Sequence, residues 1–402
     1  MKICVVGAGV VGCSTAYQLQ KLGHEVTLVD GAAAPGLGTS FANGGQLSYS
    51  YVEPLANPST FWSLPSLLLK PDSPVRFRFR RDPRQWLWGL KFLAACRGSQ
   101  ARAGARQLLE LGAISRATLE QWLNEEPLSF GFRRNGKLVI CPTHDVLQRQ
   151  ASLVVSQTRA GIAQTVLSRD ECIAREPRLS RYAGFVGGVW TPSECAADPH
   201  LYCVALCEAA KRRGMRTIFG RKVRAFAISK GVARALVTEQ GDVEADAFVL
   251  CAGMSSGSLA AGLGEWLTIY PVKGYSLTLA YSEGQTRPAA SVTDLSRKMV
   301  LAPLGDTLRV AAMAELVGED LRIPQERLDW MQRAVESVYP GLCDFSAVNA
   351  WAGLRPSTPD SLPIIRPSRV PNVILNVGHG ALGFTLAAGS AKLVARLLVS
   401  PH

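Results

Sequence analysis

The chain has 402 residues, of which 47% are hydrophobic and 19% are charged, and its formal net charge is +12. This composition excludes a disordered chain, and the length is too great for one small core, so we expect two domains. The positive charge predicts that the protein contacts an anionic partner, and the candidates are a membrane surface, RNA and an anionic substrate.

Two further features bear on the cell compartment. No eighteen-residue apolar run without charge occurs and the first strand begins at once, so we expect neither a transmembrane helix nor a signal peptide. The ten cysteines are scattered, without a CxxC pair or a ligand-like histidine spacing. We therefore expect buried thiols in a reducing cytoplasm and no metal site, and the pattern argues against a disulfide reductase.

Residues 2–30 predict a dinucleotide site. An apolar strand runs into a GxGxxG motif, a helix of small residues follows, and a second strand ends at Asp30. Gly7 allows the tight turn, Gly9 lets a pyrophosphate approach the backbone, and Gly12 lets helix and strand pack closely. The start of the helix offers N–H groups to phosphates, and Asp30, eighteen residues past Gly12, suits a ribose hydroxyl. The residues expected at this site are Gly7, Gly9, Val10, Val11, Gly12 and Asp30.

The elements that follow are predicted by hydrophobic period and capping residues. Helices are expected over 10–22, 104–124, 145–159 and, with Asp198 at the cap, 198–213, and a short helix is expected after the capping box of Ser168 and Glu171. Strands are expected at Lys137–Cys141, Arg216–Phe219, Val223–Ile228, Ala233–Thr238 and Ala247–Leu250. Residues 270–278 are expected to enter a second, antiparallel sheet.

A second glycine-rich junction between a strand and a helix lies at residues 376–385. A flavin needs two such junctions, one for its pyrophosphate and one whose N–H groups face the N1–C2=O edge, where negative charge develops on reduction. The pair of junctions therefore favours FAD over NAD.

Basic and aromatic residues alternate between residues 76 and 106, for example at Phe79, Arg84, Trp86 and Lys91, after Phe61-Trp62 and Leu67–Leu69. This mixture suits a peripheral membrane contact, with rings at the headgroup level and cations facing anionic lipid. It also suits a solvated surface whose aromatic side chains lie in the core, and both interpretations stay open.

Five motifs along the chain form a specific combination. They are GAGVVG at 7–12, TSFANGGQ at 39–46, PVKGYSLT at 271–278, GLRPSTPD at 353–360 and GHGALGFT at 378–385. Over nearly its whole length the chain resembles the D-amino acid oxidase/glycine oxidase-like flavoenzymes, and among them the FAD-containing subunit of bacterial D-amino acid dehydrogenases. It departs from that pattern at 311–315, where relatives commonly have a glycine pair, and through 291–303, which lines the pocket in relatives.

The resemblance implies an α/β fold with a Rossmann-like, glutathione-reductase-like FAD-binding domain and a second, α+β substrate domain built on an antiparallel sheet. The implied boundaries are 1–46, 196–262 and 345–402 for the FAD-binding domain and 47–195 and 263–344 for the substrate domain. It also implies that loop 39–46 passes close to the isoalloxazine ring and that Val223 contacts the adenine region. The expected contacts beyond the N-terminal motif are Thr39, Ser40, Asn43, Gly44, Gly45, Gln46, Val223, Ala252, Gly253, Gly378, His379, Gly380, Leu382, Gly383, Phe384 and Thr385.

The implied activity is oxidative deamination of a D-amino acid to a 2-oxo acid and ammonia, by hydride transfer from the α-carbon to flavin N5. Arg355 is expected to clamp the substrate carboxylate with its guanidinium fork. Tyr275 is expected either to touch substrate through its hydroxyl or only to pack. His379 is expected either to support the reduced ring or only to space the backbone. Lys273 is expected near the flavin or as a solvated lysine at a strand end.

Electrons are expected to pass to a quinone or another acceptor instead of to oxygen, and the basic aromatic segment at 61–92 motivates this expectation. The enzyme is expected in the cytoplasm, in contact with the inner face of the cell membrane if that segment binds lipid. Partner subunits are left open. The alternatives are related enzymes acting on glycine, sarcosine or D-hydroxyproline. A flavin-dependent tRNA-modifying oxidoreductase is less favoured, because no RNA-binding module is recognisable although the charge would suit RNA.

Overall fold

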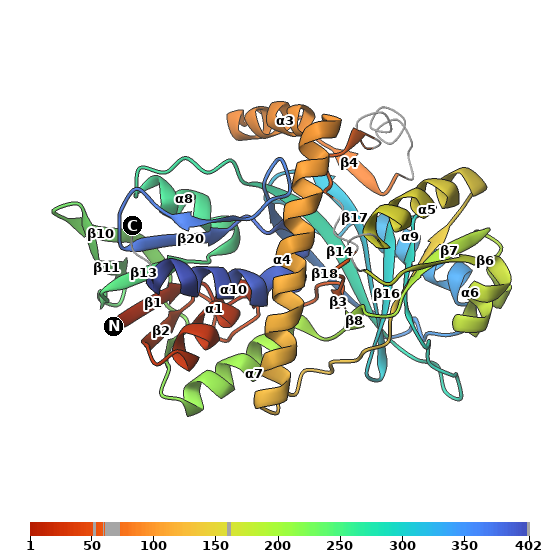
Figure 1. Cartoon of the computed structure of the whole chain (residues 1–402), viewed down its shortest axis with the longest axis horizontal. Coiled ribbons are helices and arrows are strands. Elements are labelled where there is room, and N and C mark those ends of the chain that lie inside the picture. Colours follow the sequence, from red (N-terminus) through yellow and green to blue (C-terminus); the bar gives the residue numbers. More distant parts are fainter. Residues whose placement is uncertain (51–53, 59, 61–72, 159–161, 400–402) are drawn as a thin grey trace.

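The structure is a computed structural model, and it describes residues 1–50, 54–58, 60, 73–158 and 162–399. In this part of the chain a six-stranded sheet and a nine-stranded sheet lie at opposite ends of the molecule, on the left and right of Figure 1. Phe61-Trp62 and Leu67–Leu69, which belong to the expected membrane contact, lie outside the described residues.

The six-stranded sheet consists of five parallel strands and one antiparallel edge strand. Its order is β19 (Ile364–Pro367), β20 (Val373–Val377), β13 (Ala247–Leu250), β1 (Lys2–Val6), β2 (Glu25–Val29) and β9 (Arg216–Ile218). Strands β13 and β20 are buried along their whole length, as parallel strands are when both faces of the sheet are covered.

Two different layers cover this sheet. Apolar side chains of helices α1 (Val10–Lys21), α7 (Pro199–Arg212) and α10 (Gly383–Val399) pack on one face. On the other face lie helix α8 (Ser256–Ala261) and a small sheet of β10 (Val223–Ser229), β11 (Val232–Thr238) and β12 (Val243–Glu244). The predicted Rossmann-like domain is confirmed, and its predicted elements begin and end within a residue or two of the observed ones.

The nine-stranded sheet is mainly antiparallel, as expected, with parallel pairs only at β5–β15 and β4–β17 among the described strands. Its order is β18 (Asn349–Ser357), β14 (Tyr270–Ala280), β17 (Thr307–Leu316), β16 (Met299–Leu304), β15 (Ser291–Asp294), β5 (Lys137–Cys141), β7 (Gly187–Thr191) and β6 (Thr165–Ser168), with β4 (Val75–Phe77) beside β17. Helix α9 (Gln325–Val338) packs on one face through Met331 and Val335.

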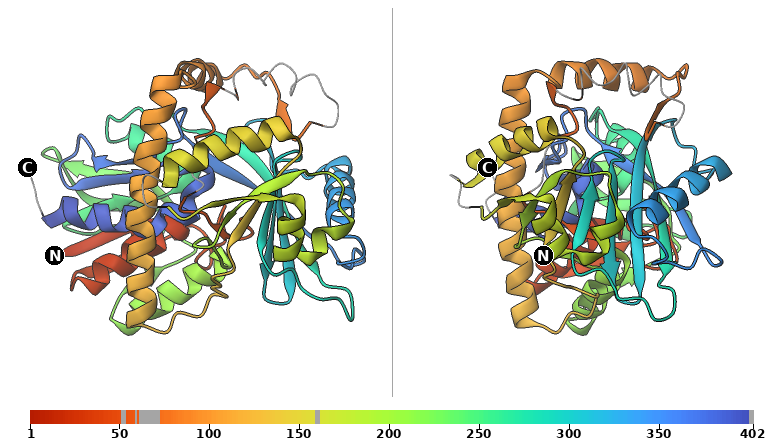
Figure 2. Two further views of the ribbon diagram at one scale, coloured as in Figure 1. Left: turned by 45° about the vertical axis from the view of Figure 1, so that its right-hand side comes forward. Right: turned by 90° about the vertical axis from the view of Figure 1, so that its right-hand side faces the viewer.

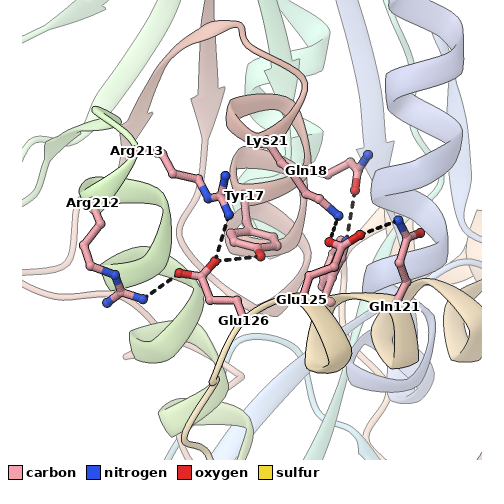
Figure 3. A network of polar contacts seen from close by, with 9 residues as sticks. Tyr17, Gln18, Lys21, Gln121, Glu125, Glu126, Arg212 and Arg213 are labelled. Carbon is pink, nitrogen blue, oxygen red and sulfur yellow. Dashed lines mark hydrogen bonds and ion pairs between the residues drawn. The ribbon is translucent and has the colours of Figure 1, made fainter.

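Helix α4 (Gly98–Glu125) runs the height of the molecule across the front in Figure 1, and in the right-hand view of Figure 2 it lies along one edge of the molecule. Its C-terminal end is held to α1 and α7 by the polar network of Figure 3. Glu126 accepts a hydrogen bond from the Tyr17 hydroxyl (3.0 Å) and pairs with Arg212 (2.7 Å), while Lys21 pairs with Glu125. This helix therefore ties residues distant in sequence to the nucleotide-binding layer.

The proposed domain boundaries remain a prediction, and two elements bear on them. Strand β18 lies inside the range 345–402, yet it pairs with β14 of the nine-stranded sheet. Helix α4 lies inside 47–195, yet Ser115 donates a hydrogen bond to the carbonyl of Thr385 in α10 (2.6 Å).

The smaller elements complete the chain. The capping box of Ser168 and Glu171 is present at α6. The others are α3 (Pro83–Ala95), α5 (His144–Thr158), α6 (Arg169–Arg175), β3 (Gln46–Leu47), β8 (Cys195–Ala196) and the 3-10 turns η1 (Pro177–Arg181), η2 (Gly253–Ser255) and η3 (Gly380–Leu382). All ten cysteines are buried and unpaired, as expected.

Within the residues that the structure describes, one segment, Gly380–Val399, is long and apolar enough by composition to cross a membrane, although no transmembrane helix is expected from the sequence. It contains α10, and 56% of its apolar window is buried inside the protein. Its buried residues, among them Phe384 and Val394, pack in the core beneath the six-stranded sheet. The segment is therefore a core helix in this fold.

Candidate functional site

The two predicted glycine-rich junctions lie side by side. A Cβ placed on Gly383, the first residue of α10, would be 3.9 Å from Cγ2 of Val10, the first residue of α1. Helix N-termini carry backbone N–H groups and the positive end of the helix dipole. The fold therefore directs two positive helix ends toward one region.

The glycines of the first junction leave space that side chains would fill. Gly7 has φ +104°, and a Cβ there would lie 2.4 Å from the carbonyl oxygen of Cys251. A Cβ on Gly12 would lie 1.7 Å from the Gly7 carbonyl oxygen, whereas one on Gly9 would meet only the Ser40 Oγ, at 3.1 Å. Gly7 and Gly12 are thus required by the turn itself, and Gly9 leaves the backbone open to a ligand.

Replacing Gly12 by alanine is expected to abolish cofactor retention. The new methyl group would overlap the Gly7 carbonyl, and overpacking of this kind destabilises by about 1–3 kcal/mol. The flavin-to-protein absorbance ratio of the purified protein measures the effect. Gly38→Ala is the matched control, because a Cβ there meets no atom within 4 Å; a normal ratio in G12A would contradict the assigned cradle.

Asp30 lies at the end of β2, beside this turn. Its carboxylate accepts hydrogen bonds from the backbone N–H of Ala8 (2.5 Å) and of Ala32 (2.7 Å). A carboxylate has about four acceptor positions, so these bonds leave room for a ribose hydroxyl. The carbonyl of Asp30 also accepts from the N–H of Arg221 (3.1 Å), which places Val223, two residues later, close to this end of the sheet.

The loop at residues 39–46 bridges the two sheets. The Thr39 hydroxyl donates to the Leu354 carbonyl on β18 (2.8 Å), and Ser40 Oγ accepts from the Val10 N–H at the start of α1 (3.1 Å). A Cβ on Gly44 would lie 3.1 Å from the side chain of Ala311 on β17. The loop therefore lies between the helix starts and the nine-stranded sheet.

Arg309, which the sequence analysis did not select, holds this loop in place. Its guanidinium donates to the Asn43 carbonyl (2.8 Å) and to the Thr278 hydroxyl (2.8 Å), and it pairs with Asp198 at 3.2 Å. Burial lowers the pKa of Arg309. The signal available in the sequence is an arginine within the otherwise apolar run 308–314.

The second junction contains a buried histidine. Gly378 and Gly380 have φ +78° and +54°, and His379 between them is 4% exposed. Its Nε2 has no hydrogen-bond partner among the described residues, and the same holds for the buried Nε2 of Gln46 in loop 39–46. Unpartnered buried nitrogen atoms beside a glycine cradle fit a polar ring such as the isoalloxazine of FAD.

Three other expected cofactor contacts, Leu382, Phe384 and Thr385, have side chains that contact other parts of the protein. The Phe384 ring is buried against Tyr202, 5.2 Å between centroids, so only its backbone can face a cofactor. Leu382 packs at the edge of a cluster formed by Leu108 and Leu386. Thr385 Oγ1 accepts from the Ser48 N–H at 3.2 Å and donates to the Gln46 carbonyl at 3.5 Å, which links α10 to the end of loop 39–46.

Burial lowers the pKa of His379 from 6.5 to about 3, so the folded protein keeps this imidazole neutral. The unfolded chain binds a proton below pH ~6.5, and the folded chain does not until about pH 3. Stability conferred by the neutral ring is thus complete above this window and falls as pH is lowered through it. We expect a loss of about 1.4 kcal/mol between pH 8 and pH 5.5.

Urea unfolding of the holoprotein at these two pH values measures this effect. The loss should shrink in His379→Gln and persist in the control His144→Gln, since His144 is exposed on α5. An unchanged loss in H379Q would show that another group is responsible.

Arg355 lies on β18, where its guanidinium packs over a backbone glycine of β14. A Cβ on Gly274 would be 2.2 Å from Nη2, and Nη1 donates to the Met313 carbonyl at 3.0 Å. Met313 has φ +70° at an irregularity in the β14–β17 register, which turns this carbonyl toward the arginine.

Arg355 forms no ion pair with any carboxylate in the described part of the chain. Burial lowers its pKa to about 10, so it remains charged at neutral pH. A partly buried cation without a counter-ion is unfavourable unless an anion binds to it. The described residues therefore do not hold Arg355 in a structural ion pair.

The same face of the sheet carries further residues that sequence reasoning missed. Arg355, Gly353 and Trp351 alternate along β18, so they share one face. The Trp351 indole covers Gly353, where a Cβ would be 1.9 Å from Cη2, and Ser276 lies opposite Trp351. Ser276 Oγ is buried and has no partner among the described residues. We call Trp351, Gly353, Arg355, Gly274 and Ser276 the Arg355 face.

Tyr275 and Lys273 lie on the opposite face of β14 from Gly274. The Tyr275 hydroxyl donates to Glu315 (2.7 Å), which pairs with Arg327 at 2.8 Å. The Lys273 ammonium lies 4.8 Å from the centre of the Tyr275 ring, and Lys273 is buried, not solvated. Burial lowers the pKa of Lys273 and, with Glu315, raises that of Tyr275. The structure does not bring the Tyr275 hydroxyl to the Arg355 face, and its surroundings match the packing role.

The second glycine-rich junction, loop 39–46 and Arg355 come together around the end of β18. His379 forms a β-bridge with Ser357, two residues from Arg355, and the Thr39 bond holds the residue before Arg355. No group of three or more metal-ligating side chains occurs within the described ranges. The arrangement can hold an extended dinucleotide across two helix starts and place an anionic ligand beside its ring.

Comparisons with known proteins agree with this arrangement. A family model described as DAO, FAD dependent oxidoreductase, matches residues 2–397. D-amino acid dehydrogenase 2 of Pseudomonas aeruginosa is 45% identical over 98% of this chain and 94% of its own, and D-amino acid dehydrogenase 2 of Ralstonia nicotianae is 44% identical over 99% and 96%.

Among solved structures, glycine oxidase from Bacillus cereus superposes with a TM-score of 0.76 at 20% identity, over 99% of this chain and 94% of that one. L-proline dehydrogenase from P. horikoshii gives 0.77 at 18% identity, over 99% and 92%. These two show a shared fold. The family match covers almost the whole chain and confirms both the expected flavoenzyme family and FAD as its cofactor: the chain belongs to the DAO family of FAD-dependent oxidoreductases.

Proposed function

We propose that this protein is an FAD-dependent dehydrogenase of D-amino acids, which converts them to 2-oxo acids and ammonia. The observation that carries the proposal is Arg355, a cation without a counter-ion beside two glycine-lined helix starts. The 45% identity to a protein named D-amino acid dehydrogenase 2 over nearly the full chain supports the substrate class.

The residues suggest a division of labour. Gly7, Gly9 and Gly12, with the N–H groups of Val10 and Val11, hold the pyrophosphate, and Asp30 accepts from the ribose. Loop 39–46 and residues 378–380 line the ring, with the neutral His379 and Gln46 offering hydrogen bonds to it. Bound FAD supplies the hydride acceptor.

Arg355 binds the substrate carboxylate through two parallel hydrogen bonds, which fixes the rotation of the α-carbon. Trp351 covers part of the same face and packs against the substrate side chain. Holding the α-hydrogen within about 3–3.5 Å of its acceptor is the main demand of the reaction. The substrate loses a hydride and a proton, and water hydrolyses the resulting imine to the 2-oxo acid and ammonia.

The proposed electron acceptor is a quinone of the cell membrane, with the enzyme on the cytoplasmic side. Support comes from helix α3, which exposes Trp86, Leu90 and Leu93 at the outer edge of the molecule (Figure 2). Related activities on glycine, sarcosine or D-hydroxyproline are the alternative, since they would use the same carboxylate clamp.

An anaerobic screen of the holoprotein tests the substrate. D- and L-amino acids, glycine, sarcosine and D-hydroxyproline are mixed with the enzyme and an artificial dye acceptor, and flavin bleaching and dye reduction are followed. We expect D-amino acids to reduce both. Reduction by glycine or sarcosine alone would favour the alternative, and rapid reoxidation of the reduced enzyme by oxygen in stopped flow would make it an oxidase.

A further inference from the structure

A lysine and a glutamate are buried together beside the segment that follows loop 39–46. Lys137 on β5 is 4% exposed, and Glu194, in the turn between β7 and β8, is 1% exposed. The Lys137 ammonium donates to the Ser48 hydroxyl (2.9 Å), and Glu194 accepts from the Ser50 N–H (2.8 Å). The other Glu194 oxygen, Oε2, has no partner among the described residues. Charged groups are costly to bury, and the proposed reaction uses neither of these two.

Ser48 connects Lys137 to the second helix start. The Ser48 N–H donates to Oγ1 of Thr385, the third residue of α10 (3.2 Å), and Thr385 Oγ1 donates to the Gln46 carbonyl (3.5 Å). Lys137 is therefore two hydrogen bonds away from the helix start whose N–H groups are expected to face the N1–C2=O edge of FAD. That edge is where negative charge develops on reduction.

A second buried cation, Arg309, contacts the same loop but differs from Lys137 in its chemistry. Arg309 pairs with Asp198 at 3.2 Å, and a guanidinium does not lose its proton near neutral pH. Burial lowers the pKa of Lys137 from 10.5 to about 8, although the charge of Glu194 opposes this change. Of these two cations, Lys137 is thus the one whose charge can change near neutral pH.

Apart from Glu194, whose pKa is raised by burial, the groups around Lys137 are neutral at pH 7. Burial raises the pKa values of Tyr49 and Cys195, so both keep their protons. The other described groups around the pair are hydroxyls: Ser48 and Ser50, Ser291 opposite Lys137 on β15, and Thr191 opposite it on β7. Lys137 and Glu194 therefore form the titrating pair of this buried cluster.

We infer that Lys137 is a redox-linked proton site, which gains a proton when the bound FAD is reduced and so stabilises the reduced form. Oxidation of a D-amino acid zwitterion to its iminium form releases one hydride and one proton. The hydride brings one negative charge to the cofactor, and a proton bound at Lys137 Nζ balances that charge. Opposite charges attract strongly where water is excluded, so reduction and protonation of Lys137 favour each other. The inference rests on the proposed function only for the identity of the substrate.

The midpoint potential of the bound FAD, measured against pH with a chemical reductant and reference dyes, tests the inference without any amino acid. We expect the potential to fall about twofold more steeply with pH above about pH 8, because reduction there takes up a second proton. In Lys137→Met the slope should stay constant, and at pH 7 the reduced form should be disfavoured at least ~10-fold, which is ~30 mV for a two-electron couple. Lys137→Arg keeps a charge that does not titrate, so it should keep the wild-type potential at pH 7 and lose the change in slope.

Two further variants complete the test. Lys211→Met is the matched control, because Lys211 is an exposed lysine that pairs with Glu208 (3.3 Å), and its curve should match that of wild type. The double substitution Lys137→Met, Glu194→Gln leaves no unpaired carboxylate in the core and should also lose the change in slope. It takes the place of the single variant if that variant does not retain FAD.

A constant slope in the wild type would overturn the inference, as would a change in slope that persists in either methionine variant at position 137. A wild-type change in slope that depends on Lys137, in a protein that D-amino acids do not reduce, would leave the inference standing and overturn the proposed substrate.

Discussion

Replacing Arg355 by alanine is expected to lower kcat/KM for a D-amino acid by about 30- to 5,000-fold. Truncating one partner of a desolvated, hydrogen-bonded charge pair costs about 2–5 kcal/mol. The substrate carboxylate would lose its partner on the Arg355 face, where burial already lowers the arginine pKa to about 10 and the described residues supply no competing carboxylate. Steady-state kinetics with an artificial acceptor measure the effect.

Two controls separate the clamp from general loss of charge or fold. Arg322→Ala removes an exposed arginine that pairs with Asp320, and it should leave kcat/KM within twofold. The flavin-to-protein ratio of R355A should match that of wild type, because Arg355 is not assigned to the pyrophosphate cradle. A change in kcat/KM of less than threefold in R355A would mean that another group anchors the substrate.

The substitution Arg355→Lys distinguishes the geometry of the carboxylate clamp from its charge. An ammonium group keeps the positive charge but cannot form the two parallel hydrogen bonds of a guanidinium. We therefore expect R355K to recover only part of the lost activity. Full recovery would show that the site needs a point charge and not a planar fork.

The nucleotide-binding half was predictable because its signals are local. The GxGxxG turn, the strand that ends at Asp30 and the cap at Asp198 each specify a short stretch of backbone, and each was found as expected. Gly12 illustrates the reason. Glycine is required at this position because a Cβ would overlap the carbonyl of Gly7, only five residues earlier in the chain.

The substrate half was less predictable because its arrangement depends on pairing between distant segments. Arg355 was selected by its motif, but the glycine beneath it, Gly274, is 81 residues earlier in the chain and meets it only through the β14–β18 register. The role of Arg309 depends on loop 39–46 passing over β17. Tyr275 shows the limit of motif reasoning, since β-strand alternation turns its hydroxyl to Glu315.

Helix α3 was not predicted at all. Its residues carry apolar side chains on both faces, so the sequence lacks the single apolar stripe that marks an amphipathic helix. The open alternatives for residues 76–106 were a membrane contact and a solvated surface with buried aromatics, and the structure contains features of both. Trp88 and Phe92 are buried, whereas Phe79 and Trp86 are exposed.

Replacing Gly274 by alanine is expected to lower kcat/KM by about 100-fold while the protein stays folded and retains FAD. The added methyl group would lie 2.2 Å from Nη2 of Arg355, so the guanidinium must move, and a displacement of about 1 Å in a positioning group can cost that much. Gly257→Ala is the matched control, because a Cβ there meets nothing within 4 Å.

The decisive measurement uses the double variant. Once Arg355 is alanine, G274A has no guanidinium to displace and should lower kcat/KM less than threefold further. If the two substitutions instead reduced activity independently, Gly274 would act on the fold of β14 and not through the arginine that lies on it.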